Sequence, residues 1–261
     1  MEKKLLNNYH THTTRCRHAS GTEREFVEHA VSLGMTTLGF SDHTPYIFPG
    51  GYVSYFRMRE NEAEDYFNTV RGLKEEYKDK IKIHAGLEVE YYPDLFQKLC
   101  AFLKDFQPDY FLLGQHFTEN EYDSFYIAHS FFKKSYLQDY LSQVTEALDS
   151  GLFTYLAHPD LPDYDGGDSK AYEKFALDLC EACKKRDIPI ELNLLGLKTG
   201  RHYPNPEFFR VAGALQNKVI LGYDAHRTED FSIPTLQRAH AMVEKYNLNL
   251  IDDVELVKPK L

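Results

Sequence analysis

Short apolar or β-branched runs recur along the chain, and most of the segments between them have the periodicity of amphipathic helices. The runs cover residues 5–9, 36–40, 80–89, 110–114, 153–157, 188–195 and 218–223. Helical segments are expected at 22–34, 60–78, 93–105, 134–150, 168–186, 205–215 and 234–246. The pattern therefore predicts seven strands that alternate with helices.

The first helical segment shows how the expected helices are bounded. Thr22 can cap the amino end, and Glu25 stands three residues further on, as in a capping box. Gly34 can close the carboxyl end, because glycine tolerates the left-handed conformation found there.

Strands that alternate with helices favour a parallel sheet joined by right-handed crossovers. Seven strands suggest an α/β barrel closely related to the eight-stranded TIM barrel, with an open doubly wound sheet as the alternative. No glycine-rich phosphate loop of the GxGxxG or GxxxxGK[ST] type follows the first run, which argues against the open sheet. Histidines follow it instead.

The length of 261 residues suits one large domain, predicted to span 1–261. Hydrophobic residues make up 43% and charged residues 27%, and no Pro/Gly/Ser-rich linker divides the chain. These values are typical of an ordinary globular protein.

The formal net charge of −10 argues against a general nucleic-acid-binding surface, because that affinity depends mainly on Lys and Arg. The sequence shows neither a signal-peptide core nor an apolar stretch long enough to span a membrane. We therefore expect a cytoplasmic protein with neither a nucleic-acid nor a membrane partner.

Four cysteines are too few and too scattered for a disulfide framework. Cys180 and Cys183 form a CxxC, but they fall in a segment with helical spacing and lack a second pair. Two packed helix cysteines are expected rather than a metal or redox pair.

Metal-compatible or hydrogen-bonding side chains follow every predicted strand. They are His10 and His12, Asp42 and His43, Glu88 and Glu90, His116, His158, Glu191 and Asn193, and Asp224 and His226. The carboxyl ends of barrel strands lie on one face, so these residues are expected to meet in a single mouth, where barrel enzymes place their active sites.

The local spacing supports a metal site. Residues at i and i+2 of an extended segment point to the same side, so His10 and His12 can hold one ion together, and Asp224 and His226 repeat this spacing. Zinc, manganese and iron accept imidazole and carboxylate ligands, and Glu88 can bridge two ions. The other histidines are read as surface or hydrogen-bonded core residues.

The segments HTHTTRCRHA, GLEVEYYP, ELNLLGL, YPNP and GYDAH resemble the polymerase-and-histidinol-phosphatase (PHP) superfamily of metal-dependent phosphoesterases. The resemblance extends from His10 to Asp230 and is strongest to the histidinol-phosphate phosphatase branch. It implies a distorted (β/α)7 TIM-like barrel with three divalent metal ions, which are Zn, Mn or Fe. It also implies hydrolysis of L-histidinol phosphate in histidine biosynthesis.

Carried over by position, the resemblance implies three groups of ligands. The first ion would be bound by His10, His12, Glu88 and Asp224; the second by Glu88, His116 and His158; the third by His18, His43 and His226. Cys16 or Asp42 could replace or support His18, and Asp42 is expected to orient a ligand by hydrogen bonding.

We expect a hydroxide that bridges two ions to attack phosphorus, without a phosphoenzyme. Asp160, Asp224 or a mobile histidine could protonate the leaving oxygen. Arg201 is the preferred phosphate clamp because guanidinium matches phosphate oxygens with paired donors. Arg15, Arg17 and Arg227 are rivals, and an ordinary surface role is the alternative for each arginine.

The ammonium and imidazole of histidinol require carboxylate and aromatic groups, and Glu191 and Asn193 are expected to serve this end of the substrate. Residues 44–60 form either a lid over the mouth or a packed surface hairpin. The alternative functions are hydrolysis of another small phosphate ester (a nucleotide, sugar phosphate or phosphotyrosine) and a non-catalytic metal-binding barrel.

Overall fold

Parallel strands run through the centre of the protein, paired in chain order in one sheet. The computed structural model describes residues 4–261. The strands are β1 (Asn7–Asn8), β2 (Thr37–His43), β3 (Lys82–Val89), β4 (Phe111–Leu113), β5 (Tyr155–Leu156), β6 (Ile190–Asn193), β7 (Lys218–Gly222) and β8 (Asn249–Leu250). Each predicted run overlaps one strand, β2 continues to His43 beyond the run at 36–40, and β8 is an additional strand that the sequence pattern did not indicate.

The first and seventh strands approach each other at their carboxyl ends. Thr11 and Ala225 form an isolated parallel bridge. The His12 amide donates to the Ala225 carbonyl at 2.8 Å, and the Ala225 amide donates to the His10 carbonyl at 3.1 Å. These bonds draw the sheet into a TIM-like barrel at this end, which confirms the predicted α/β class.

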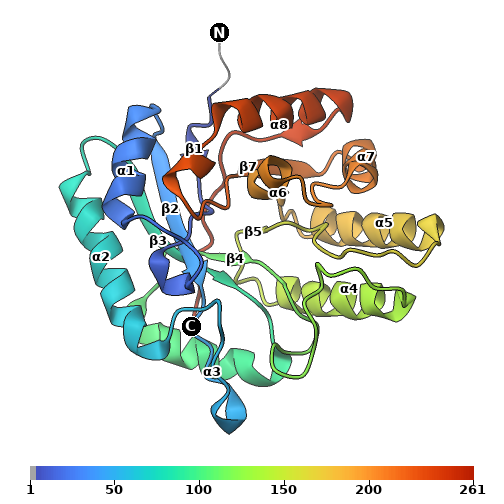
Figure 1. Ribbon diagram of the computed structural model, residues 1–261, viewed down its shortest axis with the longest axis horizontal. Coiled ribbons are helices and arrows are strands. Elements are labelled where there is room, and N and C mark those ends of the chain that lie inside the picture. The colour runs from blue at the N-terminus through green and yellow to red at the C-terminus, as the bar shows by residue number, and fades with distance from the viewer. Residues whose placement is uncertain (1–3) are drawn as a thin grey trace.

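Helices surround the strands in chain order, as Figure 1 shows. They are α1 (Glu23–Ser32), α2 (Ala63–Glu76), α3 (Pro93–Leu103), α4 (Lys134–Asp149), α5 (Ser169–Lys185), α6 (Leu194–Thr199), α7 (Pro206–Leu215) and α8 (Ile233–Lys245). The Thr22–Glu25 capping box is present at α1, and Gly34 follows this helix with φ of 77°.

The predicted run 188–195 is partly wrong. The strand ends at Asn193, whose side chain accepts a hydrogen bond from the Gly196 amide and so begins helix α6. Asparagine is a preferred capping residue, and this bond competes with continuing the strand.

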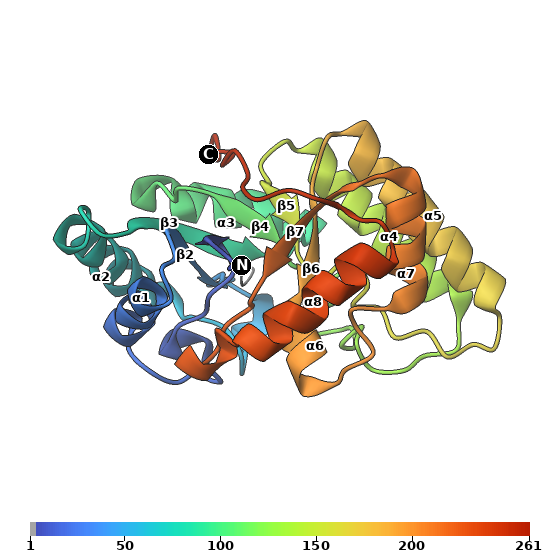
Figure 2. The same ribbon diagram turned by 90° about the horizontal axis from the view of Figure 1, so that it is seen from above.

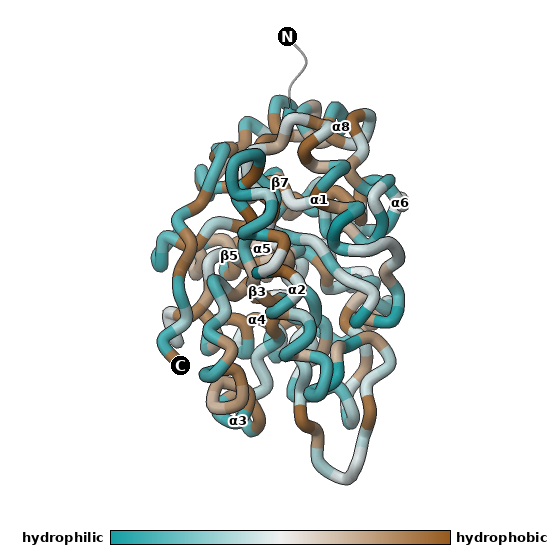
Figure 3. Tube along the Cα trace, turned by 90° about the vertical axis from the view of Figure 1, so that its left-hand side faces the viewer, coloured by the Kyte–Doolittle hydropathy of each residue, from teal (hydrophilic) through white to brown (hydrophobic). Residues whose placement is uncertain are grey.

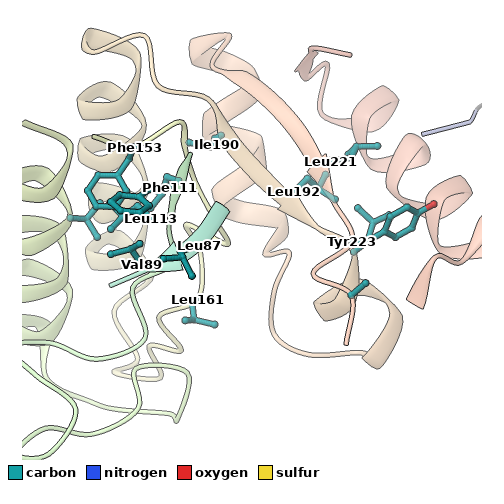
Figure 4. Packing of buried hydrophobic residues seen from close by; sticks show 14 of the residues in the cluster. Leu87, Val89, Phe111, Leu113, Phe153, Leu161, Ile190, Leu192, Leu221 and Tyr223 are labelled. Atoms are coloured by element: carbon teal, nitrogen blue, oxygen red, sulfur yellow. The ribbon is translucent and has the colours of Figure 1, made fainter. Parts of the chain in front are cut away.

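The main core lies between the strands and the surrounding helices. Phe111, Leu113 and Val89 come from adjacent strands and group with Phe153, while Leu192 and Leu221 lie together further along the sheet (Figure 4). Hydrophilic and hydrophobic positions are mixed along α8, as expected for a helix that buries one side (Figure 3).

A smaller cluster fills the barrel interior. It contains Tyr9, Tyr110, Leu112, Tyr155, Ala157 and Ile220, and Ile251, Val254 and Leu256 pack against it. Figure 2 shows the segment that follows α8 crossing the ends of the strands. The segment is tied there because the Asn7 side chain donates to the Asp252 carbonyl at 3.0 Å and the Val257 amide donates to Thr154 at 3.1 Å.

Cys180 and Cys183 both lie buried in α5 as free thiols, where the sequence placed them. Burial raises the pKa of Cys183 to about 12, so its thiol stays protonated near neutral pH.

Among residues 4–261, no helix combines the length and the apolarity needed to cross a bilayer. The cytoplasmic location stays a prediction.

Candidate metal centre

The predicted metal ligands lie at the carboxyl ends of the strands or in the turns that follow them. His10 and His12 follow β1, His43 ends β2, Glu88 lies near the end of β3, His116 and His158 follow β4 and β5, and Asp224 and His226 follow β7. His18 follows a short 3-10 turn, Thr14–Cys16. The Thr11–Ala225 bridge sets the HxH and DxH segments side by side.

Glu88 lies at the centre of the cluster. Its Oε1 is 2.8 Å from His158 Nε2 and 3.5 Å from His10 Nε2, and its Oε2 is 2.9 Å from His43 Nδ1. His116 is more distant, with Nε2 at 3.9 Å from Oε1. One carboxylate therefore faces imidazoles from several strands, the arrangement expected of a bridging ligand.

Asp224 shares His10 with Glu88 and also faces His12. Its Oδ1 lies 3.1 Å from His12 Nε2 and 3.4 Å from His10 Nε2. Ligand atoms of His10, His12 and Asp224 all lie within 4.8 Å of one another, as do those of His10, Glu88 and His158. The first triad contains three of the four ligands predicted for the first ion, and the second joins Glu88 and His158 to His10 in place of the predicted His116.

A third group contains His18, His43 and His226, whose ligand atoms lie within the same 4.8 Å limit. Cys16 forms a further group with His12 and His226, so it remains a rival ligand. Asp42 lies behind His12, with Oδ1 at 3.4 Å from His12 Nδ1, the position expected for a residue that orients this ring.

Unpartnered polar atoms test whether the cluster suits cations. His10 Nε2, His12 Nε2 and Glu88 Oε2 are buried and make no hydrogen bond within the described chain. Buried polar atoms are rarely left without a partner, because the loss costs about 1–3 kcal/mol each. Imidazole nitrogens and a carboxylate oxygen aimed at one another fit divalent cations.

Two of the predicted ligands have unusual backbone conformations. His158 has φ of 31° and Asp224 has φ of 50°, in the left-handed region that non-glycine residues seldom adopt. Such residues cost on the order of 1–3 kcal/mol each and tend to occur at functional sites. The His158 amide is held by a hydrogen bond to Glu191 Oε2 at 3.1 Å.

Glu191 and Asn193 lie beneath the predicted ligands and do not line the cavity above them. Glu191 Oε1 is 2.8 Å from His10 Nδ1, and the Asn193 amide donates to Glu191 Oε2 at 3.0 Å and to Asp224 Oδ2 at 3.1 Å. Both residues are fully buried. Their predicted contact with substrate is not supported, because their polar atoms already pair with His10, the His158 backbone amide and Asp224.

A cavity of about 1040 Å³ opens above the cluster. Its lining includes the predicted ligands Glu88, His116 and His158 together with Arg201 and Arg227. Aromatic side chains also line it: Tyr55, Phe56, Phe117, Tyr126 and Tyr203. Because Tyr55 and Phe56 belong to residues 44–60, this segment forms part of the cavity wall; the sequence identified the segment but not these aromatic contacts.

Arg15 and Arg17 do not line this cavity. Arg15 pairs with Glu23 and Asp65, and Arg17 pairs with Glu62. Both guanidinium groups are thus committed to carboxylates, which leaves Arg201 and Arg227 as the arginines of the mouth.

Asp160 also lies outside the cavity lining. It is completely buried and accepts a hydrogen bond from the Asn205 amide. Burial raises the pKa of Asp160 to about 7. The position ties the loop after β5 to the start of α7, so direct proton donation to substrate is not supported.

Cation loading is expected to release protons near neutral pH. Burial alone would lower the pKa of His10, but Glu191, Asp224 and Glu88 raise it well above 6.5 in the cation-free protein. The pKa of His12 is likewise raised, by Asp224 and Asp42, against the effect of burial. Ligation requires neutral imidazole, so both rings must lose protons, and affinity should fall as pH decreases.

Calorimetric titration with Zn²⁺ in two buffers of different ionisation heat measures this release. At pH 7 the observed heats should differ between the buffers, and the difference should shrink above the raised pKa values. Equal heats in both buffers at pH 7 would contradict protonated His10 and His12.

Comparison with known proteins places this geometry in a family. The model of the PHP domain matches residues 8–194. A Deinococcus radiodurans protein described as a probable histidinol-phosphatase is 28% identical over 228 residues, which cover 84% of this chain and 85% of the relative. The Bacillus subtilis histidinol-phosphatase is 29% identical over 120 residues, 43% of this chain and 44% of that protein.

A solved structure has the same fold. Histidinol phosphate phosphatase from Lactococcus lactis, complexed with zinc, L-histidinol and phosphate, superimposes with a TM-score of 0.71 at 18% identity and covers 97% of this chain and 100% of its own. The family model covers most of the chain, including the predicted ligands from His10 to His158. The chain belongs to the PHP domain family.

Proposed function

We propose that the protein hydrolyses L-histidinol phosphate to L-histidinol and inorganic phosphate, and that residues 1–261 act as one phosphoesterase domain. The main observation that supports metal-dependent hydrolysis of a phosphate ester is the buried cluster of imidazoles around Glu88 and Asp224 at the base of an open cavity. The substrate is supported by the relatives named histidinol-phosphatase and by the Lactococcus lactis complex.

The cluster would hold up to three divalent ions, which we propose to be Zn, Mn or Fe. His10, His12, Asp224 and Glu88 would hold one, Glu88, His158 and His116 a second, and His18, His43 and His226 a third. When bound, such ions neutralise phosphate oxygens and lower the pKa of water, which is the chemistry that monoester hydrolysis requires.

The protein side chains provide orientation. Glu191 fixes the ring of His10, and Asn193 fixes the carboxylate of Asp224. Burial alone would raise the pKa of Asp224, but His10 and His12 hold it well below 3.8. Asp224 is therefore ionised at neutral pH, which suits a ligand or proton acceptor and not the acid that protonates the leaving oxygen.

Arg201 is proposed to bind the phosphate. It lies in the cavity wall, and its Nη1 donates to the Tyr203 hydroxyl at 2.7 Å, which fixes one edge of the guanidinium group. Guanidinium offers paired donors to phosphate oxygens. Tyr55, Phe56 and Tyr126 would face the imidazole of histidinol, and the exposed Glu229 at the rim would attract its ammonium group.

A substrate panel tests the assignment. Initial rates are compared for L-histidinol phosphate, sugar phosphates, nucleotides and phosphotyrosine, with the protein loaded in turn with Zn²⁺, Mn²⁺ and Fe²⁺. We expect kcat/KM for L-histidinol phosphate to exceed the others by at least about 100-fold, because a site that pairs polar substrate groups rejects analogues lacking them. Equal, slow turnover of every ester would refute the substrate.

A further inference from the structure

Arg57 is a fully buried cation in the segment that forms the cavity wall, with a side chain only 1% exposed. Its Nε donates to Glu121 Oε2 at 2.5 Å, and its Nη2 donates to Glu90 and, at 3.1 Å, to the Tyr92 hydroxyl. The guanidinium group also lies 4.6 Å from the centre of the Phe56 ring. The side chain therefore joins residues 44–60 to the residues that directly follow β3 and to the loop after β4.

Glu90 connects Arg57 to His116. The Glu90 Oε1 atom accepts a hydrogen bond from the His116 amide at 2.9 Å and lies 2.8 Å from His116 Nδ1. With Nδ1 as the donor, His116 keeps a lone pair on Nε2, the nitrogen that faces Glu88 Oε1 at 3.9 Å. The carboxylate thus fixes both the tautomer and the direction of this ring.

Arg57 and His116 hold opposite oxygens of the same Glu90 carboxylate. The Arg57 Nη2 atom and the Tyr92 hydroxyl both donate to Glu90 Oε2, while Oε1 faces His116. Loss of Arg57 would therefore release one side of the carboxylate that orients His116.

The neighbouring residue brings the same segment over the metal ligands. The ring of Phe56 lies 5.2 Å from that of His43 and 6.1 Å from that of His116, centre to centre. Phe56 also lines the cavity. The placement of this wall and the orientation of His116 consequently depend on the same side chain, Arg57.

We propose that Arg57 is a positioning residue that couples residues 44–60 to His116 through Glu90 and so sets the affinity of the cation held by His116. The proposal rests on the proposed metal-dependent function. Lysine is a poor substitute, because a single ammonium group cannot reproduce the fork that joins Glu90, Glu121 and Tyr92.

The experiment compares Arg57→Lys with Glu121→Gln. Glu121→Gln removes the other carboxylate that Arg57 contacts and leaves the Glu90–His116 link in place, so it is the matched control for loosening the segment. Proteins loaded with Zn²⁺ are exposed to graded concentrations of a chelator, and retained zinc is counted by elemental analysis. Circular dichroism checks that each variant is folded.

In Arg57→Lys, one ion should be lost at chelator concentrations about 10- to 100-fold lower than in the wild type, the usual effect of removing a group that orients a ligand. Glu121→Gln should retain its ions as the wild type does. Equal retention in Arg57→Lys and the wild type overturns the proposal. Equal loss in both variants also overturns it, because Arg57 would then only anchor the segment.

Arg57→Ala with millimolar guanidinium chloride gives a second test, in case the lysine variant is unfolded. Guanidinium that enters the space left by the side chain should restore zinc retention and should not do so in Glu90→Gln. No rescue in a folded Arg57→Ala variant overturns the proposal. Retention is measured without substrate, so failure of the wild type to hydrolyse L-histidinol phosphate refutes the proposed substrate separately.

Discussion

Replacing Glu88 by glutamine is expected to lower phosphate-ester hydrolysis at least about 1,000-fold, because cations contribute several kcal/mol to catalysis and each 1.36 kcal/mol is a factor of ten in rate. Glu88 carries the negative charge that His10, His43 and His158 face. The amide has the same shape but carries no charge, so it should bind cations poorly while leaving the surrounding packing intact.

Steady-state kinetics with L-histidinol phosphate and elemental analysis of the purified variant provide the measurement. Glu76→Gln is the control, because Glu76 forms a half-exposed pair with Arg24. The control should match the wild type in rate and metal content. Retention of full activity by Glu88→Gln would mean that the chemistry does not depend on this cluster.

A single methyl group at Gly114 is expected to have an effect of similar size. A Cβ at this position would collide with the Cγ, Cδ and Oε1 atoms of Glu88. Glu88 is buried among imidazoles, so it cannot swing aside without leaving His158 and His10. Gly114→Ala should therefore lose bound cations and nearly all hydrolysis.

Gly72→Ala is the matched control, since a Cβ there meets nothing within 4 Å. Gly72 lies inside α2, where alanine is favoured over glycine by about 1 kcal/mol. This control should keep its activity and gain stability in thermal unfolding. Wild-type metal content in Gly114→Ala would show that Glu88 can bind cations from another position.

The barrel and the convergence of the proposed ligands could be predicted from the sequence, because both follow from the regular alternation of strands and helices. Parallel strands place their carboxyl ends on one face, so His10, Glu88, His158 and Asp224 could be expected to meet although they lie far apart in the chain. The closing bridge between Thr11 and Ala225 was not predictable, because two isolated residues leave no hydrophobic pattern.

The sequence pattern does not show how far along the barrel axis a side chain lies, and this limited the prediction of the site. Alternation indicates that Glu191 and Asn193 point to the same side as one another, but not whether they reach the cavity or stop beneath the ligands. The structure shows the second arrangement, and space for Glu191 exists only because Gly222 lacks a Cβ. Such a fit between two strands depends on register, which the sequence pattern does not reveal.

Residues that act through tertiary contacts were also missed. Arg57 stands in a loop without periodicity, so nothing in its neighbourhood distinguishes it from a surface arginine. Its burial depends on Glu90 and Glu121, which lie on other segments. The short strand β8 was not predicted because its two residues, Asn249 and Leu250, are too few to form an apolar run.

None of the proposed cation ligands belongs to a helix; they occupy strand ends and the turns beyond them. Apart from α6, whose Leu195, Lys198 and Thr199 line the cavity, the helices contribute to the site only through packing, so substitutions there that preserve volume and polarity need not disturb the chemistry. Sequence differences between relatives should therefore accumulate first in these outer helices. Relatives that share fewer than three residues in ten with this chain can thus still inherit an intact reactive centre.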